Sequence, residues 1–165
     1  MLASGKLSIY KIFVKPKNMA LLENKKIYFD YEILEKLEAG IELLGTEVKS
    51  LRSGKGSLVG SYIIVRGGEA YASGMDIAAY QEKNAPSDYD SKRLRRLLLS
   101  KAEIKKLAAI EAKKGLTIVP ISVYNKGHKL KLEIAVVRGK KTHNKKESDK
   151  SRDVEREVRR EFTDR

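Results

Sequence analysis

The chain has 165 residues, enough for one domain with a modest core, and its 35 lysines and arginines outnumber its 22 acids to give a formal net charge of +13. It contains no cysteine and only two histidines, His128 and His143, so disulfides and thiolate metal sites are excluded and a histidine-based metal site or triad is disfavoured. Because such a charge excess weakens the compact state by self-repulsion, it indicates a polyanionic partner such as nucleic acid.

A membrane surface is the competing polyanion. Against it, the sequence has no apolar run approaching about 18 residues and no lipidation motif. Residues 1–18 are basic and lack both a continuous apolar segment and a small-residue cleavage site, so they do not predict a signal peptide. We therefore expect a cytoplasmic protein that does not bind membranes. Met19 resembles a fresh start, so residues 1–18 are either a translated upstream region or a flexible extension.

The first predicted element is a long strand over residues 27–39, IYFDYEILEKLEA. Its aromatic and β-branched residues alternate with acids, which favours a strand. A helix remains the alternative, because Leu34, Leu37 and Ile41 also have helical spacing.

Two glycine-marked elements follow. Residues 45–54, GTEVKSLRSG, predict a short helix that is capped by Thr46 or its neighbour and ended by Gly54. Within residues 61–73, the runs SYIIV and EAYAS flank Gly67-Gly68 and predict a hairpin, because glycine accepts positive φ at both turn positions.

The next segment is a predicted exposed loop over residues 81–93, QEKNAPSDYDSKR. It leads to the best-marked helix, in which Ser100 and Glu103 form a capping box and Gly115 provides the stop. The apolar residues at helical spacing are Ile104, Leu107, Ala108 and Ile110.

Two further strands, LTIVPISVY and HKLKLEIAVV, flank a turn at residues 125–127. In the second strand Leu130, Leu132 and Ile134 alternate with charged residues, which predicts one buried and one wet face. Short strands, glycine turns and one intervening helix favour a mainly β fold, a small antiparallel barrel with added helices, over residues 19–138.

The composition changes after Arg138. Residues 139–165 offer few core-forming side chains, although Val154, Val158 and Phe162 recur at a spacing of four on one helical face. A segment that buries so little apolar surface does not stay ordered alone in water. We expect a basic tail that becomes helical against a partner.

The sequence offers little for catalysis, so we expect neither an enzyme nor a cofactor. Residues 54–57, GKGS, lack the Walker spacing and its strand and helix context. Glu38 and Glu42 could form an acid–base pair, but isolated acids of this kind are more often solvated strand residues. No metal site is predicted.

Short basic clusters are the stronger signal. Lysine-rich loops can serve solubility alone, but several clusters beside a large net excess favour phosphate contacts. The clusters are Lys25-Lys26, Lys49 with Arg52 and Lys55, Arg93 with Arg95 and Arg96, Lys140-Lys141, and Lys145-Lys146. Tyrosines on predicted strands could stack on bases, although tyrosine in strands more often packs; they are Tyr28, Tyr31, Tyr62 and Tyr71.

Several motifs, in order from about residue 24 to 147, resemble one bacterial family, the SsrA-binding proteins or small protein B. The matching segments are Asn24-Lys25-Lys26 ahead of Tyr31, Glu38-Ala39-Gly40, GTEVKSLR at 45–52, RLRRLLL at 93–99, Val119-Pro120 and Gly139-Lys140-Lys141. The resemblance implies an oligonucleotide-binding (OB) barrel that binds the tRNA-like part of transfer-messenger RNA and brings it to stalled ribosomes. It also implies that residues 139–165 enter the empty messenger channel and fold there, and we expect a monomer.

The resemblance and the basic clusters together give the expected site residues. Those expected to bind RNA are Asn24, Lys25, Lys26, Glu38, Lys49, Arg52, Lys55, Arg93, Arg95, Arg96, Leu97, Lys140 and Lys141. Those expected at the ribosomal decoding centre are His143, Asn144, Lys145 and Lys146.

One acid among the expected RNA-binding residues, and one departure from the family pattern near His143, require separate interpretations. A carboxylate repels phosphate, so Glu38 is interpreted as a recognition group for exocyclic amines or 2′-hydroxyls, or as an orienting group for a neighbouring cation. The family usually has Asp-Lys-Arg after the His143 position, whereas this chain has Asn144-Lys145-Lys146, which removes a carboxylate and a planar guanidinium.

A general RNA chaperone and a metal-dependent nuclease are the alternative functions, and the nuclease would need a carboxylate cluster that the sequence does not show.

Overall fold

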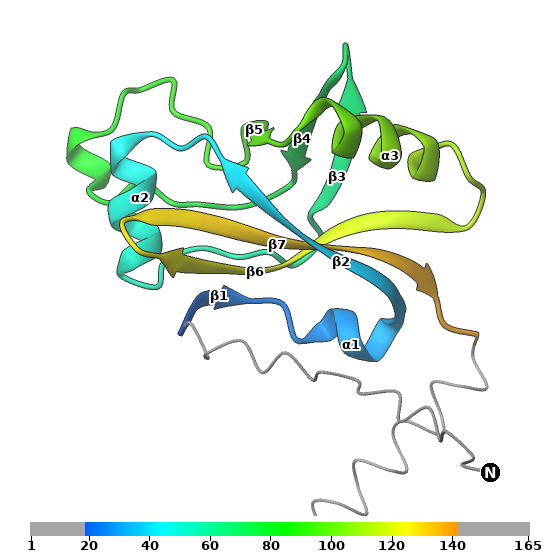
Figure 1. The fold of residues 1–165 in the computed structure, drawn as a ribbon. Coiled ribbons are helices and arrows are strands. Elements are labelled where there is room, and N and C mark those ends of the chain that lie inside the picture. The colour runs from blue at the N-terminus through cyan, green and yellow to red at the C-terminus, as the bar shows by residue number, and fades with distance from the viewer. Residues whose placement is uncertain (1–18, 142–165) are drawn as a thin grey trace, which may run out of the picture.

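The computed structural model describes residues 19–141, and its dominant feature is one antiparallel sheet of seven strands (Figure 1). In chain order the elements are β1 (Ala20–Glu23), α1 (Lys26–Asp30), β2 (Tyr31–Ile41), α2 (Gly45–Arg52), β3 (Tyr62–Arg66), β4 (Glu69–Ser73), a 3₁₀ turn (Glu82–Asn84), β5 (Arg95–Leu98), α3 (Lys101–Glu111), β6 (Leu116–Lys126) and β7 (Lys129–Gly139).

The strands follow the order β1-β6-β7-β2-β5-β4-β3, and every pairing is antiparallel. This confirms the prediction of a mainly β fold with added helices. Within residues 19–141 no ladder joins β1 to β3, so hydrogen bonding leaves the sheet open rather than closed into a barrel. In Figure 1 the sheet twists so that β3 and α3 lie on one side of the β6–β7 pair and α1 lies on the other.

The two faces of the sheet are built differently. The inner face, which carries Leu132 and Ile134 of β7, packs against Leu107 and Ile110 of α3 in the main core. The opposite, outer face is covered near α1 by a smaller cluster in which Ile27 contacts the strands. Its other buried members are Val119, Ile121, Ala135 and Val137. The second half of β7 is therefore buried on both faces, which is why IAVV lacks the alternation of the preceding residues.

The prediction of a strand over residues 27–39 is wrong at its start, because residues 26–30 form α1 and the strand begins at Tyr31. Tertiary contacts fix this short helix more than its sequence does. Ile27 is buried in the outer cluster, while Lys140 donates from its backbone N–H to the Asp30 carbonyl (3.1 Å) and from Nζ to the Tyr28 carbonyl (3.0 Å). A cation and an N–H from the end of β7 thus satisfy the carbonyl end of the helix.

The other marked elements agree with the sequence in type and differ in detail. Helix α2 begins after Leu44, whose N–H donates to the Glu47 carboxylate (2.9 Å), so Thr46 is not the cap. The hairpin β3–β4 turns through Gly67 and Gly68, both at positive φ. Two short strands, β1 and β5, were not predicted.

Helix α3 has the predicted capping box: Ser100 Oγ accepts from the Glu103 N–H (3.3 Å), and the Glu103 carboxylate accepts from the Ser100 N–H (2.8 Å). The helix ends at Glu111, and Gly115, with φ of +84°, lies in the turn that leads into β6. The glycine therefore serves the turn rather than the helix terminus.

Gly40 of β2 lies directly opposite Leu98 of β5. A Cβ at position 40 would lie 2.9 Å from the Leu98 Cβ, an atom that can move only if the backbone moves. The sheet therefore requires glycine here for close approach of two strands.

We predict that Gly40→Ala lowers the free energy of unfolding by about 1–2 kcal/mol, because the added methyl overpacks the β2–β5 contact. Gly45→Ala is the matched control, since nothing lies within 4 Å of a Cβ there. Urea denaturation of both variants measures the difference. Equal stabilities would show that the β2–β5 contact adapts.

Candidate nucleic-acid interface

A buried carboxylate holds α2 against β5. Glu47 has no exposed surface, and its Oε2 accepts from Arg93 Nη2 (2.7 Å). Its Oε1 accepts from Arg93 Nε (2.8 Å) and from Arg95 Nη2 (2.9 Å) and Nε (3.1 Å). We call Glu47, Arg93 and Arg95 the buried ion triad. It joins residues 46 to 48 positions apart in the sequence.

Charge pairing outweighs desolvation in the triad. Burial by itself raises the pKa of Glu47. Hydrogen bonds from Arg93, from the Leu44 N–H and from Arg95 lower it by more than burial raises it, so the pKa of Glu47 lies below the ordinary carboxyl value. Tyr89 from the 81–93 loop donates to the Ile77 carbonyl (2.7 Å) beside the triad, and burial raises its pKa. The carboxylate is therefore charged at neutral pH and fully bonded.

Two of the predicted RNA ligands face inward. Arg95 has no exposed surface, and its remaining N–H groups donate to the carbonyls of Met75 (2.6 Å) and Ser91 (2.8 Å). Leu97 is 2% exposed and belongs to the main core. Direct RNA contact by Arg95 or Leu97 conflicts with this burial, and both residues instead hold the strand in place.

The outer face beyond α1 carries a polar surface that includes Glu38. Its carboxylate accepts from Lys126 Nζ (2.7 Å) and from the Tyr124 hydroxyl, and burial together with that bond raises the pKa of Tyr124. Alternation along the paired strands places the neighbouring side chains on the same face. They are Lys36 and Gly40 of β2, Ser122 of β6, Lys131 and Glu133 of β7, and Arg96 and Leu98 of β5. We call this set, with Glu38, Tyr124 and Lys126, the polar platform.

Leu98 is the apolar member of the platform and was missed by the sequence prediction, which chose Leu97. It is 54% exposed, and it lies over Gly40, two residues beyond Glu38 on β2. The signal was available in the β5 sequence, because adjacent strand residues point to opposite faces and Arg95 and Leu97 share the inner one.

Arg96 is the member of its cluster that reaches the surface. It is half-exposed and pairs with Glu69 (3.1 Å) and, more distantly, Glu42 (3.9 Å). Such exposed pairs are weak and exchange readily for a phosphate. Of the three predicted arginines, Arg96 is therefore the most exposed, and it lies on the platform.

One end of the platform is cationic through α2 and the β6–β7 turn. Lys49, Arg52 and Lys55 are all exposed. Arg52 Nη2 donates to the His128 carbonyl (3.3 Å), and Lys55 Nζ lies 5.8 Å from the Tyr80 ring centroid. These contacts orient the side chains and leave their charges in solvent.

The other end is cationic through α1 and the end of β7. Lys25, Lys26 and Lys141 are exposed, and Lys140 is anchored on α1. Asn24 is only 6% exposed, and its Nδ2 donates to the Leu58 carbonyl (3.3 Å). Figure 1 shows α1 and α2 at opposite ends of the β6–β7 pair, so basic groups lie at both ends of the platform.

The predicted tyrosines are divided between packing and surface. Tyr28 is partly exposed and accepts from Lys36 Nζ (3.2 Å), which also lies 5.2 Å from its ring centroid. Tyr31 packs on the outer cluster, Tyr62 is 45% exposed, and Tyr71 donates to Glu69 (2.8 Å). The predicted decoding-centre and tail residues lie outside the described part of the chain: His143, Asn144, Lys145, Lys146, Val154, Val158 and Phe162.

Residues 19–141 contain no group of three or more histidine, cysteine, aspartate or glutamate side chains arranged to hold a metal ion. They also contain no helix that is both long and apolar enough to span a bilayer.

Comparison with known proteins gives consistent matches. Residues 21–164 match the family model described as SmpB protein. The SsrA-binding protein of Chlorobaculum tepidum is 46% identical over 145 residues, covering 87% of this chain and 92% of the relative. That of Oleidesulfovibrio alaskensis is 50% identical over 142 residues, covering 86% and 91%. A solved structure described as "tmRNA-SmpB: a journey to the center of the bacterial ribosome" matches with a TM-score of 0.62 and 44% identity, covering 73% of this chain and 85% of the other.

We predict that Glu47→Gln lowers the free energy of unfolding by about 3 kcal/mol at pH 7, because it leaves two guanidinium groups without their buried counter-charge. Since the pKa of Glu47 is lowered by folding, its stabilising contribution is present above the unfolded pKa and is lost as pH falls through the folded value. The difference from wild type should therefore shrink below about pH 4. Urea denaturation as a function of pH measures it.

Glu42→Gln is the matched control, because Glu42 is 62% exposed and pairs with Arg96 at 3.9 Å. Its cost should stay below about 0.5 kcal/mol at every pH. A Glu47→Gln variant that is as stable as the control would exclude the triad as a structural constraint.

Proposed function

The chain belongs to the SmpB family, and we propose on this basis that it binds the tRNA-like part of transfer-messenger RNA and brings that RNA to stalled ribosomes, where the nascent peptide is tagged for degradation. Family membership over residues 21–164 is the observation that carries the proposal. The relatives are named SsrA-binding proteins, and the matched structure is described as tmRNA-SmpB at the bacterial ribosome.

The polar platform supports the proposal physically. Basic groups at both of its ends can neutralise phosphates that lie a sheet's length apart, which supplies affinity without sequence information. Between them, Glu38 and Leu98 offer an acceptor and an apolar contact, which suit base edges, 2′-hydroxyls and ribose rather than phosphate. The arrangement fits an RNA held by its shape across an open sheet face.

We assign Glu38 an orienting role as well as a recognition role. Its carboxylate fixes the Tyr124 hydroxyl and the Lys126 ammonium. Both groups then present defined donors and an aromatic edge on the platform. Without Glu38, Lys126 would attract any polyanion. Because Lys126 is paired with the Glu38 carboxylate, the pair favours a ligand that can form hydrogen bonds with both groups.

The proposed architecture is a partly open barrel of the OB type, used for binding without catalysis. The twisted antiparallel sheet, the covering helix α3 and the exposed face of β2 support this assignment. The buried Glu47 carboxylate is bonded to two guanidinium groups and is not available for proton transfer. We propose that the protein acts as a monomer in the cytoplasm, where its ribosomal partner lies.

The proposed role of residues 139–165 is ribosomal. Strand β7 runs to Gly139, and Lys140, near the end of the described residues, is anchored on α1. We propose that His143, Asn144, Lys145 and Lys146 meet the decoding centre, and that Val154, Val158 and Phe162 form one face of a helix in the messenger channel.

We predict that the protein prefers a tRNA-like fragment of transfer-messenger RNA over an ordinary RNA duplex, and that the preference persists as salt rises. Glu38→Gln should weaken fragment binding about 10-fold and leave duplex binding almost unchanged, because it removes a recognition group and not a phosphate contact. Electrophoretic titration at several salt concentrations measures both affinities.

Glu35→Gln is the control for this variant. Glu35 is also on β2, but it pairs with Lys106 of α3 away from the platform. Wild-type protein that binds fragment and duplex equally would refute the proposed function. If Glu38→Gln lowers the affinity for the fragment and for the duplex equally, Glu38 supports the fold and does not recognise the RNA.

We predict that removal of residues 142–165 leaves affinity for the fragment within about two-fold of wild type, because the platform and both basic ends remain. The same truncation should abolish peptide tagging on ribosomes stalled in a purified translation system. If the truncated protein fails to bind the fragment, the division between an RNA-binding fold and a ribosomal tail is wrong.

A further inference from the structure

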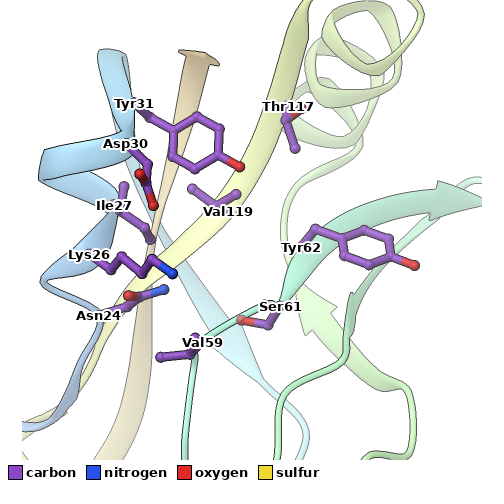
Figure 2. A pocket seen from close by; sticks show the side chains of 11 residues that line it. Asn24, Lys26, Ile27, Asp30, Tyr31, Val59, Ser61, Tyr62, Thr117 and Val119 are labelled. Carbon is purple, nitrogen blue, oxygen red and sulfur yellow. The ribbon is translucent and has the colours of Figure 1, made fainter. Parts of the chain in front are cut away.

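A pocket of about 330 Å³ lies at the α1 end of the molecule, away from Glu38 (Figure 2). It is bounded by the β1–α1 segment, the start of β2, the segment before β3 and strand β6. Its lining residues are Asn24, Lys26, Ile27, Asp30, Tyr31, Val59, Gly60, Ser61, Tyr62, Thr117 and Val119. They come from three separated stretches of the chain, 24–31, 59–62 and 117–119, so only the folded sheet assembles them.

The lining of the pocket mixes aromatic, apolar and polar side chains. In Figure 2 the Tyr31 ring lies above Val119, and Tyr62 lies across the pocket with its ring pointing away from the other labelled side chains. The Lys26 ammonium, the Asp30 carboxylate and the Ser61 hydroxyl are directed toward the space between them. A stacking surface beside a cation, an anion and a hydroxyl matches the mixed chemistry of one nucleotide.

Asn24 and Ser61 add buried polar atoms at the wall. Asn24 is 6% and Ser61 is 5% exposed, and both side chains donate to the same Leu58 carbonyl. The Asn24 Oδ1 atom is buried, and among residues 19–141 it has no hydrogen-bond partner. Buried acceptors that lack a donor are uncommon in proteins. The pocket wall therefore has acceptor capacity that the fold itself does not use.

We propose that this pocket binds one unpaired nucleotide of the RNA, with its base against Tyr31, an exocyclic amine or 2′-hydroxyl donating to Asp30, and a phosphate at Lys26. The inference rests on the proposed RNA-binding function and adds a second contact point to the polar platform. The volume suits one nucleotide and not a duplex. An isolated phosphate would use only Lys26, because it has no base to place against Tyr31 and no amine or hydroxyl of a nucleotide to donate to Asp30.

The sign of one substitution tests the proposal. Removing a carboxylate from a basic surface ordinarily strengthens binding to a polyanion. If Asp30 accepts a hydrogen bond from the nucleotide, Asp30→Asn should instead weaken binding of the tRNA-like fragment about 5- to 10-fold, with an unchanged salt slope. The matched control is Glu32→Gln, an exposed acid two residues along the chain that does not line the pocket and should leave affinity equal or slightly higher.

A second measurement uses the wild-type protein and does not depend on the folding of a variant. Ultraviolet crosslinking of the bound fragment, followed by mass spectrometry, should yield a nucleotide attached to the peptide that contains Tyr31 or Tyr62. Titration with AMP, CMP, GMP and UMP is the third arm. Saturable binding of a free mononucleotide, with RNA binding unaffected by Asp30→Asn, would overturn the RNA assignment.

The outcomes separate this inference from the proposed function. Wild-type protein that shows no preference for the fragment refutes the proposed function itself. Wild-type preference combined with an Asp30→Asn variant that binds equally or more tightly overturns the pocket alone, as do crosslinks that avoid Tyr31 and Tyr62. A loss specific to Asp30→Asn together with a crosslink at either tyrosine supports it.

Discussion

The geometry of the candidate interface depends on the buried ion triad. Glu47 and Arg95 are held out of water and Arg93 is partly covered, because the Glu47 carboxylate accepts from both guanidinium groups and the spare donors of Arg95 reach carbonyls. Such a group is costly to desolvate and is tolerated only when every partner is in place. It therefore fixes α2 against β5, and β5 against the Gly40 end of β2. The contact between α2 and β5 therefore sets the positions of the exposed α2 lysines relative to the exposed Leu98.

The acids of the chain look misplaced in an RNA-binding protein until each is assigned a partner. Glu47 forms buried ion pairs with two arginines, Glu38 accepts hydrogen bonds from Tyr124 and Lys126, and Glu103 caps α3. Each acid fixes a donor or a cation in one orientation instead of opposing the basic surface. Further basic groups remain exposed at the two ends of the platform, where they can contact phosphates.

Sequence reasoning succeeded where the signal is local and failed where it is not. Gly67-Gly68, the Ser100–Glu103 box and the alternation of β7 predicted their elements, because the partners lie within a few residues of one another. The triad was missed because Glu47 and Arg95 are 48 positions apart, and so two arginines of a basic cluster were interpreted as a surface pair. Helix α1 was missed for the same reason, since burial of Ile27 and the Lys140 contacts override its strand-like composition. Glu38 was predicted as a site residue through the family motif, whereas its bonds to Tyr124 and Lys126 of β6 became visible only in the fold.

The exposed Leu98 over Gly40 gives the platform one patch of surface that water hydrates without strong hydrogen bonds. Phosphate contacts at the two ends release counterions and so respond to ionic strength. Contact with Leu98 releases water from an apolar surface, which responds to temperature and contributes a negative heat-capacity change on binding. Gly40, which has no side chain, thus leaves room for Leu98 and adds an apolar contribution to the binding free energy of the platform. Unlike the phosphate contacts, this contribution does not weaken when the cell's salt concentration rises.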